Sequence, residues 1–297
     1  MSARFELQPG SPGARGVRDI LHRQLETALA DLPRNAPTDE QIHTARKHVK
    51  AARATLRLLR PLLSETAYRS GNRTLRDAAR ALSAARDDSV LLKTLSELAR
   101  QTSGAGKRRR LAALRADLHH DARRRRTELA RHGLRNSAAC LRSALTMVDS
   151  WPTPPQQWPP IYGSLRDSYR RGRRCARRNS RSASGSALHE WRKRAKYLRN
   201  QLEVVAPVQH ASVEAMAARL HKLSDHLGDE HDLAVLGELA RRRKALLGRK
   251  ADSALQRKIE RRRRKMCRRA LSVGLPIYAE KPARFEKRLR RYFKHWS

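Results

Sequence analysis

Residues 41–63 read QIHTARKHVKAARATLRLLRPLL, and this stretch decides the fold class. Its apolar side chains recur every three or four residues, which is the spacing of one face of an α-helix. They are Ile42, Ala45, Val49, Ala52, Leu56, Leu59 and Leu63. Cations recur at the same spacing on a different face, about 5 Å apart along the axis at a rise of about 1.5 Å per residue. These are Arg46, Lys50, Arg53, Arg57 and Arg60. The stretch therefore predicts a helix over 39–63 with one buried face and one cationic face.

The same pattern returns when the sequence is shifted by 146 residues. The shift places His43, Arg46, Lys47, Lys50 and Arg53 on His189, Arg192, Lys193, Lys196 and Arg199. A second basic row, Arg69, Arg73, Arg76 and Arg80, contributes two further matches, because Arg73 falls on Arg219 and Arg76 on Lys222. Repetition over this length predicts two copies of one structural unit. We expect residues 15–150 and 161–296 to form two helical bundles.

Helical periodicity dominates the whole chain, and strand alternation is scarce. Glycine and proline divide the chain into about twelve helical stretches. We expect helices over 17–32, 39–63, 67–84, 87–103, 107–131, 135–149, 161–181, 186–206, 210–227, 229–248, 251–272 and 281–296. Residues 151–160, WPTPPQQWPP, are too rich in proline to be helical and are expected to form a semi-rigid linker. The sequence thus predicts an all-α protein made of two repeats of about six helices each.

The charge of the chain restricts its partners. The 297 residues include 67 Lys and Arg against 28 Asp and Glu, a formal net charge of +39. Such a charge favours polyanions over neutral or cationic partners. Like charges one helical turn apart cost about 0.2–0.5 kcal/mol per pair, and the cationic rows contain none of the Glu–Lys pairs that are typical of solvated helix faces. We therefore interpret the rows as a binding site.

The absence of a cysteine framework, a signal segment and a membrane span indicates the cellular compartment. Cys140, Cys175 and Cys267 are odd in number and widely spaced, which fits neither a disulfide framework nor a metal site. The N-terminus has no apolar signal segment, and basic residues interrupt every apolar stretch before the roughly 20 residues that a membrane span requires. We expect a soluble cytoplasmic protein with no cofactor and no membrane partner.

Among polyanions, the composition favours a bare phosphate polymer. Aromatic residues make up only 4% of the chain, so few side chains can stack on bases. No zinc-finger, RNP or basic-zipper pattern is present, and the cations lie on helices that read phosphate rather than base edges. A sequence-nonspecific nucleic-acid binder that uses the same cations is the alternative.

The motif His43-x-x-Arg46-Lys47-x-x-Lys50-x-x-Arg53 and its later copy resemble the CHAD family, the conserved histidine α-helical domain. Two further stretches are similar to the other signatures of that family: Arg86-Asp87-Asp88-x-Val90-Leu91 and Leu227-Gly228-x-x-His231-Asp232-x-x-Val235-Leu236. The resemblance covers about residues 15–296 in the family's order and spacing. The chain departs from it at Asn200, where many relatives have Tyr, and at Arg86, where the second copy has His231.

The resemblance implies two bundles related by a pseudo-twofold axis, which face each other across a basic central groove or pore. It also implies that this groove binds inorganic polyphosphate and that the protein associates with polyphosphate granules. Some members of the family carry a triphosphate-tunnel domain in front of the bundle. About 15 residues precede the bundle in this chain, so we expect no hydrolase activity from such a domain, and we expect the protein not to be an enzyme.

A metal-dependent phosphohydrolase is a third hypothesis. His231-Asp232 is similar to the metal-binding pair of HD-type phosphohydrolases. Its counterpart is Arg86-Asp87, and arginine is not a metal ligand. We therefore favour an Asp that stabilises the start of a helix.

Three other basic segments are interpreted without chemistry. Residues 103–107, SGAGK, lack the first Gly, the Ser or Thr after Lys and the preceding strand of a phosphate loop, and are read as a linker. The runs Arg123–Arg126 and Arg261–Lys265 could serve nuclear localisation or membrane attachment, but an outer surface for electrostatic steering is the simpler interpretation.

The predicted polyphosphate-binding residues share a position on the repeated basic rows. They are His43, Arg46, Lys47, Lys50, Arg53, Arg57, Arg73 and Arg76 in the first copy, and His189, Arg192, Lys193, Lys196, Arg199, Arg219 and Lys222 in the second. Arginine supplies bidentate phosphate contacts, lysine supplies mobile point charges, and histidine donates hydrogen bonds, more strongly when protonated. We expect no catalytic residue and no metal ligand among them.

Overall fold

The structure is a computed structural model that describes residues 5, 7, 13–32, 38–152, 157–205 and 211–293. Within these ranges every regular element is helical, which confirms the predicted all-α class. The first half contains α1 (Gly13–Ala30), α2 (Asp39–Leu56), α3 (Glu65–Ala81), α4 (Ser83–Arg100), α5 (Ala105–Glu128) and α6 (Leu134–Asp149). The second half contains α7 (Pro159–Arg181), α8 (Gly185–Val205), α9 (Ala211–Arg242), α10 (Lys244–Ile277) and α11 (Pro282–Phe293).

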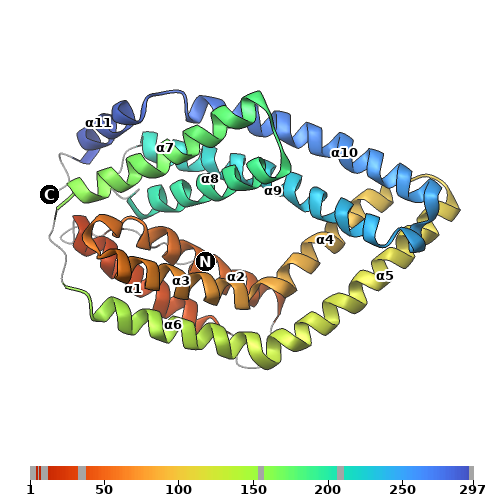
Figure 1. Cartoon of the computed structure of the whole chain (residues 1–297), viewed down its shortest axis with the longest axis horizontal. Coiled ribbons are helices and arrows are strands. Elements are labelled where there is room, and N and C mark those ends of the chain that lie inside the picture. Colours follow the sequence, from red (N-terminus) through yellow and green to blue (C-terminus); the bar gives the residue numbers. More distant parts are fainter. Residues whose placement is uncertain are drawn as a thin grey trace.

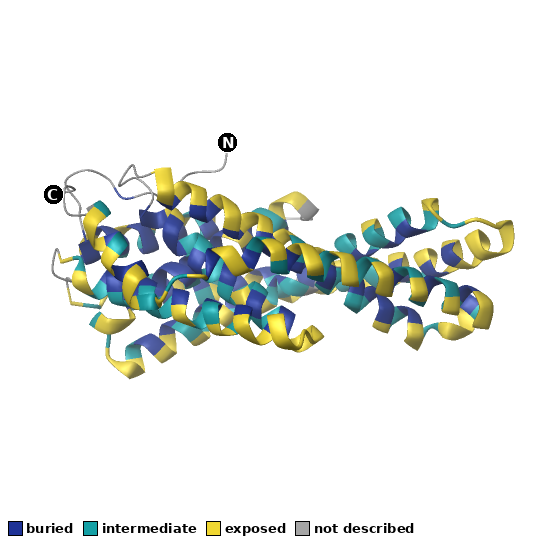
Figure 2. Cartoon of the chain, turned by 90° about the horizontal axis from the view of Figure 1, so that it is seen from above, coloured by how far each residue is buried: buried dark blue, intermediate teal, exposed yellow. Residues whose placement is uncertain are grey.

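The helices form one elongated body with a broad end and a narrow end (Figures 1 and 2). At the broad end α1, α2, α3 and α6 pack below α7, α8 and α11 in the view of Figure 1. At the narrow end α4 and α5 pack against the C-terminal part of α9 and the first part of α10. The N-terminal and C-terminal halves therefore meet at both ends of the molecule.

The buried core does not stop at the boundary between the predicted repeats. One cluster of buried side chains includes Val49 of α2 and Leu141 of α6 together with Leu198 of α8 and Leu220 of α9. A buried hydrogen bond also joins the two halves, because the Gln201 side-chain amide donates to the Ala54 backbone carbonyl at 3.1 Å. The halves thus share one hydrophobic core at the broad end, and the assignment of two repeats stays a prediction.

The helix that carries the deciding motif begins where capping chemistry places it. The Thr38 hydroxyl accepts a hydrogen bond from the Gln41 backbone N–H at 3.2 Å, and the Gln41 side chain accepts one from the Thr38 N–H at 3.0 Å. This reciprocal pair satisfies two of the N–H groups that a helix start leaves without partners. The apolar stripe then packs inward, with Ile42, Val49 and Leu56 at most 1% exposed.

The predicted extension of this helix to residue 63 is wrong, because α2 ends at Leu56. A turn and a 3₁₀-helix over Arg60–Leu62 follow. Pro61 lacks a backbone N–H, and its ring would clash with the carbonyl four residues earlier if the α-helix continued. Arg57 and Arg60 therefore lie beyond the helix that the periodicity assigned to them.

The predicted break at Gly228 is also wrong, because α9 runs unbroken from Ala211 to Arg242. A Cβ atom at Gly228 would lie 3.3 Å from the Arg192 guanidinium, so this glycine gives room to a neighbouring side chain rather than ending a helix. The break in this region falls after Arg242, and Gly248, inside α10, has φ 67° and ψ 157°. That left-handed φ is one that glycine adopts at little cost.

The prediction of a helix over 251–272 is wrong at both ends, because α10 spans Lys244–Ile277 and runs past Gly274 and Pro276. The other boundaries agree with the prediction to within about four residues. A five-residue π-helix over Leu129–Gly133 joins α5 to α6 where a break was expected at Gly133. The helix expected over 161–181 already begins at Pro159, inside the predicted linker, and residues 153–156 of that linker lie outside the described part. No helix among the described residues is long and apolar enough to cross a membrane.

Candidate polyanion-binding site

The first half of α2 does not present its predicted cations equally. Lys47 is exposed, and His43 and Lys50 are partly exposed. Arg46 is only 5% exposed, so it is far less accessible to a ligand than the sequence suggested. His48, between them, is buried and lies 2.7 Å from the Asp31 carboxylate, which gives it a structural role.

At the end of α2, two arginines donate hydrogen bonds to the same neutral side chain. The Asn72 Oδ1 atom of α3 accepts a hydrogen bond from Arg53 Nε at 2.9 Å and another from Arg57 Nη2 at 3.0 Å. Arg57 also donates to the Arg53 carbonyl at 2.6 Å. Because the acceptor is an amide rather than a carboxylate, both guanidinium groups are fixed in place while the pair keeps its positive charge.

Arg57 also reaches across to the second half of the molecule. Its guanidinium carbon lies 4.1 Å from the centre of the Tyr197 ring of α8, a cation–π contact. Burial lowers the pKa of Arg57, Tyr197 and Tyr68 oppose that shift, and the nearby charges of Arg53 and Arg194 add to it. The end of α2 is thus a crowded, partly desolvated group of cations at the junction of the two halves.

The row on α3 is less simple than predicted. Arg69 pairs with Glu65 at 2.7 Å, and Arg76 pairs with Asp77 at 3.1 Å. The prediction that this row lacks acidic partners is therefore wrong for both arginines, although exposed pairs of this kind contribute only about 0–1 kcal/mol. Arg73 lies exposed on the same helix.

On α8, two of the predicted residues, His189 and Arg192, contact the neighbouring helix α9. The rings of His189 and His231 lie 4.6 Å apart, and Arg192 lies beside Gly228. Burial lowers the pKa of His189, and the charges of His231, Lys193 and Arg192 lower it further. His189 is therefore favoured in its neutral form while no anion is bound.

Acidic side chains accompany the second copy of the row. Lys193 forms an ion pair with Glu190, and Arg199 pairs with Glu203 at 3.2 Å. The prediction that the row contains no Glu–Lys pair is wrong here, because Glu190 precedes Lys193 by three residues and shares one helix face with it. The Asn200 side chain accepts a hydrogen bond from Arg199 at 3.0 Å.

The structure does not bring Arg219 and Lys222 to the row on α8. At about 100° per residue they lie roughly 120–180° around α9 from Gly228, which faces α8. Both side chains are exposed. Lys196, by contrast, lies on α8 itself and is partly exposed.

The His-Asp pair has no helix-capping role. Asp232 lies in the interior of α9 rather than at a helix start, so the interpretation of this residue as a cap is wrong. The side chains of Arg86 and Asp87 lie outside the described part of the chain. Across the residues that the structure does describe, no three His, Cys, Asp or Glu side chains gather as they would around a metal ion.

Sequence reasoning missed three residues at the junction. Asn72 gave no signal, because a lone amide on a basic helix is common. Arg194 and Tyr197 lie three residues apart on α8, on a face about 140° from that of Lys196 and Arg192. Their spacing, continued by the buried Gln201, is a second helical stripe that could have been found by the same periodicity test.

Comparisons with known proteins point to one family. The sequence model of the CHAD domain matches residues 19–241. Among solved structures, the crystal structure of the CHAD domain from the plant Ricinus communis aligns over 100% of this chain and 98% of its own, with 17% sequence identity and a TM-score of 0.56. At that identity the likeness shows the fold. Among curated proteins, no sequence matches the chain.

Proposed function

The chain belongs to the CHAD family, and from this premise we propose that it binds inorganic polyphosphate through the basic faces of α2 and α8. Membership of the family supports a role in polyphosphate binding, but it does not identify the residues that bind. For this chain, the observation that carries the proposal is the pair of arginines at the end of α2. Arg53 and Arg57 share the neutral oxygen of Asn72, so they are fixed in position without losing charge.

The contacts available to the polymer differ along the site. The accessible cations are Lys47 and Lys50 on α2 and Lys193 and Lys196 on α8. Lysine provides a mobile point charge, whereas the fixed guanidinium groups of Arg53 and Arg57 provide planar, directional contacts. His189, which lies beside His231, can donate a hydrogen bond to phosphate. A bound phosphate would favour the protonated form of His189. Together these groups hold a phosphate polymer without requiring any bond to be made or broken.

We propose further that binding is the whole activity and that it takes place on polyphosphate granules in the cytoplasm. A protein of this kind releases no phosphate from the polymer, with or without added divalent metal. Phosphate release would support the phosphohydrolase hypothesis instead. Co-localisation of the tagged protein with a polyphosphate stain tests the cellular part of the proposal.

The binding proposal is tested by titration with polyphosphate at two salt concentrations. If several cations neutralise phosphates together, the logarithm of the affinity falls steeply and linearly with the logarithm of the salt concentration, by analogy with DNA binders. The site variant replaces Lys47, Lys50, Lys193 and Lys196 with Gln. We expect it to lose affinity by orders of magnitude, since each charged contact contributes about 1.5–3 kcal/mol and 1.4 kcal/mol is ten-fold.

A matched control removes the same charge elsewhere. The α5 control replaces Arg108, Arg109, Arg115 and Arg124 with Gln, all of them exposed on the far helix. It should keep most of the affinity. A flat salt dependence, or equal losses in the two variants, would show that the faces of α2 and α8 are not the binding surface. Short duplex DNA that competes at equal charge would favour the nucleic-acid alternative.

A further inference from the structure

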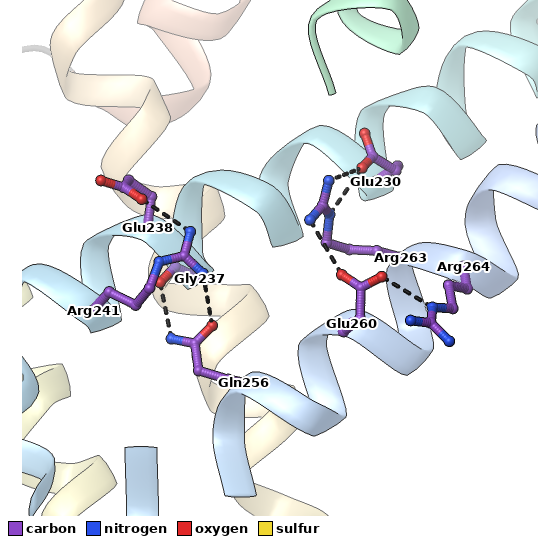
Figure 3. A network of polar contacts seen from close by, with 8 residues as sticks. All are labelled: Glu230, Gly237, Glu238, Arg241, Gln256, Glu260, Arg263 and Arg264. Atoms are coloured by element: carbon purple, nitrogen blue, oxygen red, sulfur yellow. Dashed lines mark hydrogen bonds and ion pairs between the residues drawn. The ribbon is translucent and has the colours of Figure 1, made fainter. Parts of the chain in front are cut away.

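Helix α10 carries a dense run of arginines that the structure sorts into two groups. The inward group joins α10 to its neighbours. Arg263 donates to the buried Glu230 of α9 at 2.7 and 2.9 Å and to Glu260 at 3.3 Å (Figure 3). Arg262 donates to the Gln101 side chain at the end of α4, at 2.5 Å. These side chains stabilise the packing of α10, because their charged groups bind partners within the protein.

The outward group consists of Arg257, Arg261, Arg264 and Arg268. At about 100° per residue they lie within an arc of roughly 60°, and they extend about 17 Å along the helix at 1.5 Å per residue. The opposite side of α10 is buried, with Leu255 and Ile259 each 3% exposed. The four arginines form a single straight row, which we name the outer row.

The outer row borders a shallow hollow on the surface of α10. The hollow has a volume of about 650 Å³ and is lined by the four arginines with Gln256 and Glu260. Glu260 is the only acid on it, and its carboxylate is occupied by Arg264 at 3.0 Å and by Arg263 (Figure 3). Within the described part of the chain, Arg257, Arg261 and Arg268 have no acidic partner.

A basic surface on a protein of this charge is usually a solvated face, and arginines are exposed on α5 as well as on α10. The four arginines of the α5 control, Arg108, Arg109, Arg115 and Arg124, are exposed and spread over about half a turn of that helix. The arginines of the outer row are aligned instead. Aligned like charges repel, so the alignment is unfavourable in the free protein, and a linear anion laid along the helix would relieve that repulsion.

The outer row lies away from the site on α2 and α8. Helix α9 packs against both helices, since it meets α8 where His231 faces His189 and meets α10 where Glu230 binds Arg263. The outer row lies roughly 130° around α10 from Arg263, and so faces away from this contact. In Figure 1, α10 forms the outer edge of the molecule above α9. A polymer segment held on α8 therefore does not at the same place cover the outer row.

We propose that the outer row is a second polyphosphate-binding surface, so that one protein molecule joins two segments of polymer. This inference rests on the proposed function and adds to it, because a protein with two surfaces cross-links chains whereas a protein with one only coats them. No aromatic side chain lines the hollow, which favours a bare phosphate polymer over a nucleic acid with bases to stack.

The test counts polymers and measures cross-linking. The outer variant replaces Arg257, Arg261, Arg264 and Arg268 with Gln. With short polyphosphate of uniform length, the intact protein and the α5 control should bind two chains per molecule, and the outer variant one. With long polyphosphate, the first two should scatter light as cross-linked material forms, and the outer variant should bind but stay clear. An unchanged melting temperature shows that the outer variant is folded.

Each failure has a distinct reading. If the intact protein binds no polyphosphate, the proposed function itself fails. If it binds one chain per molecule, if the outer variant still binds two, or if the α5 control loses scattering to the same extent, only the second surface is refuted. Duplex DNA that fills the second surface in place of polyphosphate also overturns the inference.

A variant that removes a negative charge from the hollow should raise the affinity for polyphosphate, whereas the outer variant lowers it. Glu260→Gln removes the one acid on the hollow and releases Arg264, while Arg263 keeps its contact with Glu230. The affinity of the second surface should rise a few-fold, and the affinity of the first should not change. An unaltered second affinity would place the polymer elsewhere on the molecule.

Discussion

Asn72 offers a substitution whose effects on stability and on binding should have opposite signs. Both Arg53 and Arg57 donate to its side-chain oxygen, at 2.9 and 3.0 Å, and all three groups are partly buried. Asn72→Asp keeps the shape and the acceptor atom but adds a negative charge between the two guanidinium groups. Asn72→Ala removes the acceptor and leaves both cations without it.

The magnitudes follow from these contacts. Each hydrogen bond to a charged group contributes about 1.5–3 kcal/mol at most, and a partly exposed ion pair adds about 1 kcal/mol or less once solvent screening is included. We therefore expect Asn72→Asp to raise the free energy of unfolding by about 1 kcal/mol and Asn72→Ala to lower it by about 1–3 kcal/mol. In a chain of this size, 1 kcal/mol corresponds to a change of about 2 °C in Tm.

Binding should respond in the other direction. The aspartate lowers the net charge of the arginine pair from about two to about one, so roughly one phosphate contact is lost. That loss corresponds to about a ten- to hundred-fold weaker affinity for polyphosphate, since 1.4 kcal/mol is ten-fold. The salt dependence should also become shallower by about one unit of slope, by analogy with DNA binding. The alanine variant keeps both charges and should bind only modestly more weakly than the intact protein.

Thermal unfolding and polyphosphate titration at two salt concentrations measure both effects on the same preparations. The expected order of stability is Asp, then Asn, then Ala, and the expected order of affinity is Asn, then Ala, then Asp. If the aspartate variant binds polyphosphate as tightly as the intact protein and with the same salt slope, Arg53 and Arg57 do not contact the polymer. The proposed role of the α2 end would then be wrong.

Two further predictions concern pH and the unity of the fold. The lowered pKa of His189 means that the unfolded chain, with a histidine pKa near 6.5, binds more protons than the folded one, so the free protein should lose stability as pH falls through that value. Bound polyphosphate should raise the pKa of His189, so affinity should increase from neutral pH to about 5.5, and a His189→Gln variant with the same increase would refute this. Because one core includes side chains from both halves, residues 1–150 alone should not reach the native fold, and a cooperative melt with native helicity by circular dichroism would contradict that.

The sequence predicted the helices well where periodicity and capping agree, and less well at glycine and proline. The pattern of Ile42, Val49 and Leu56 gave the buried face of α2 correctly. Gly228 was taken as a helix stop, yet α9 passes through it because the glycine makes room for Arg192 from another helix. A reason of that kind lies in tertiary packing, and no local pattern contains it.

The site was predictable in its residue types but not in its pairings. Periodicity identified the cations on α2 and α8, whereas the partners of those cations come from other positions in space. Asn72 lies on a different helix from the arginines it holds, and Tyr197 reaches Arg57 from the other half of the chain. Arg46 and Lys50 belong to the same periodic row on α2, yet tertiary packing buries Arg46.

The partners also make the two copies of the basic row physically unequal. In the first copy a neutral amide fixes Arg53 and Arg57, so the positive charge at the end of α2 is preserved. In the second copy Glu203 accompanies Arg199 and Glu190 accompanies Lys193, so part of the charge on α8 is already compensated. A polymer must displace or tolerate these carboxylates on α8, whereas among the described residues Arg53 and Arg57 have no acidic partner. The end of α2 should therefore supply the larger share of the attraction, although the sequence motifs of the two copies are nearly the same.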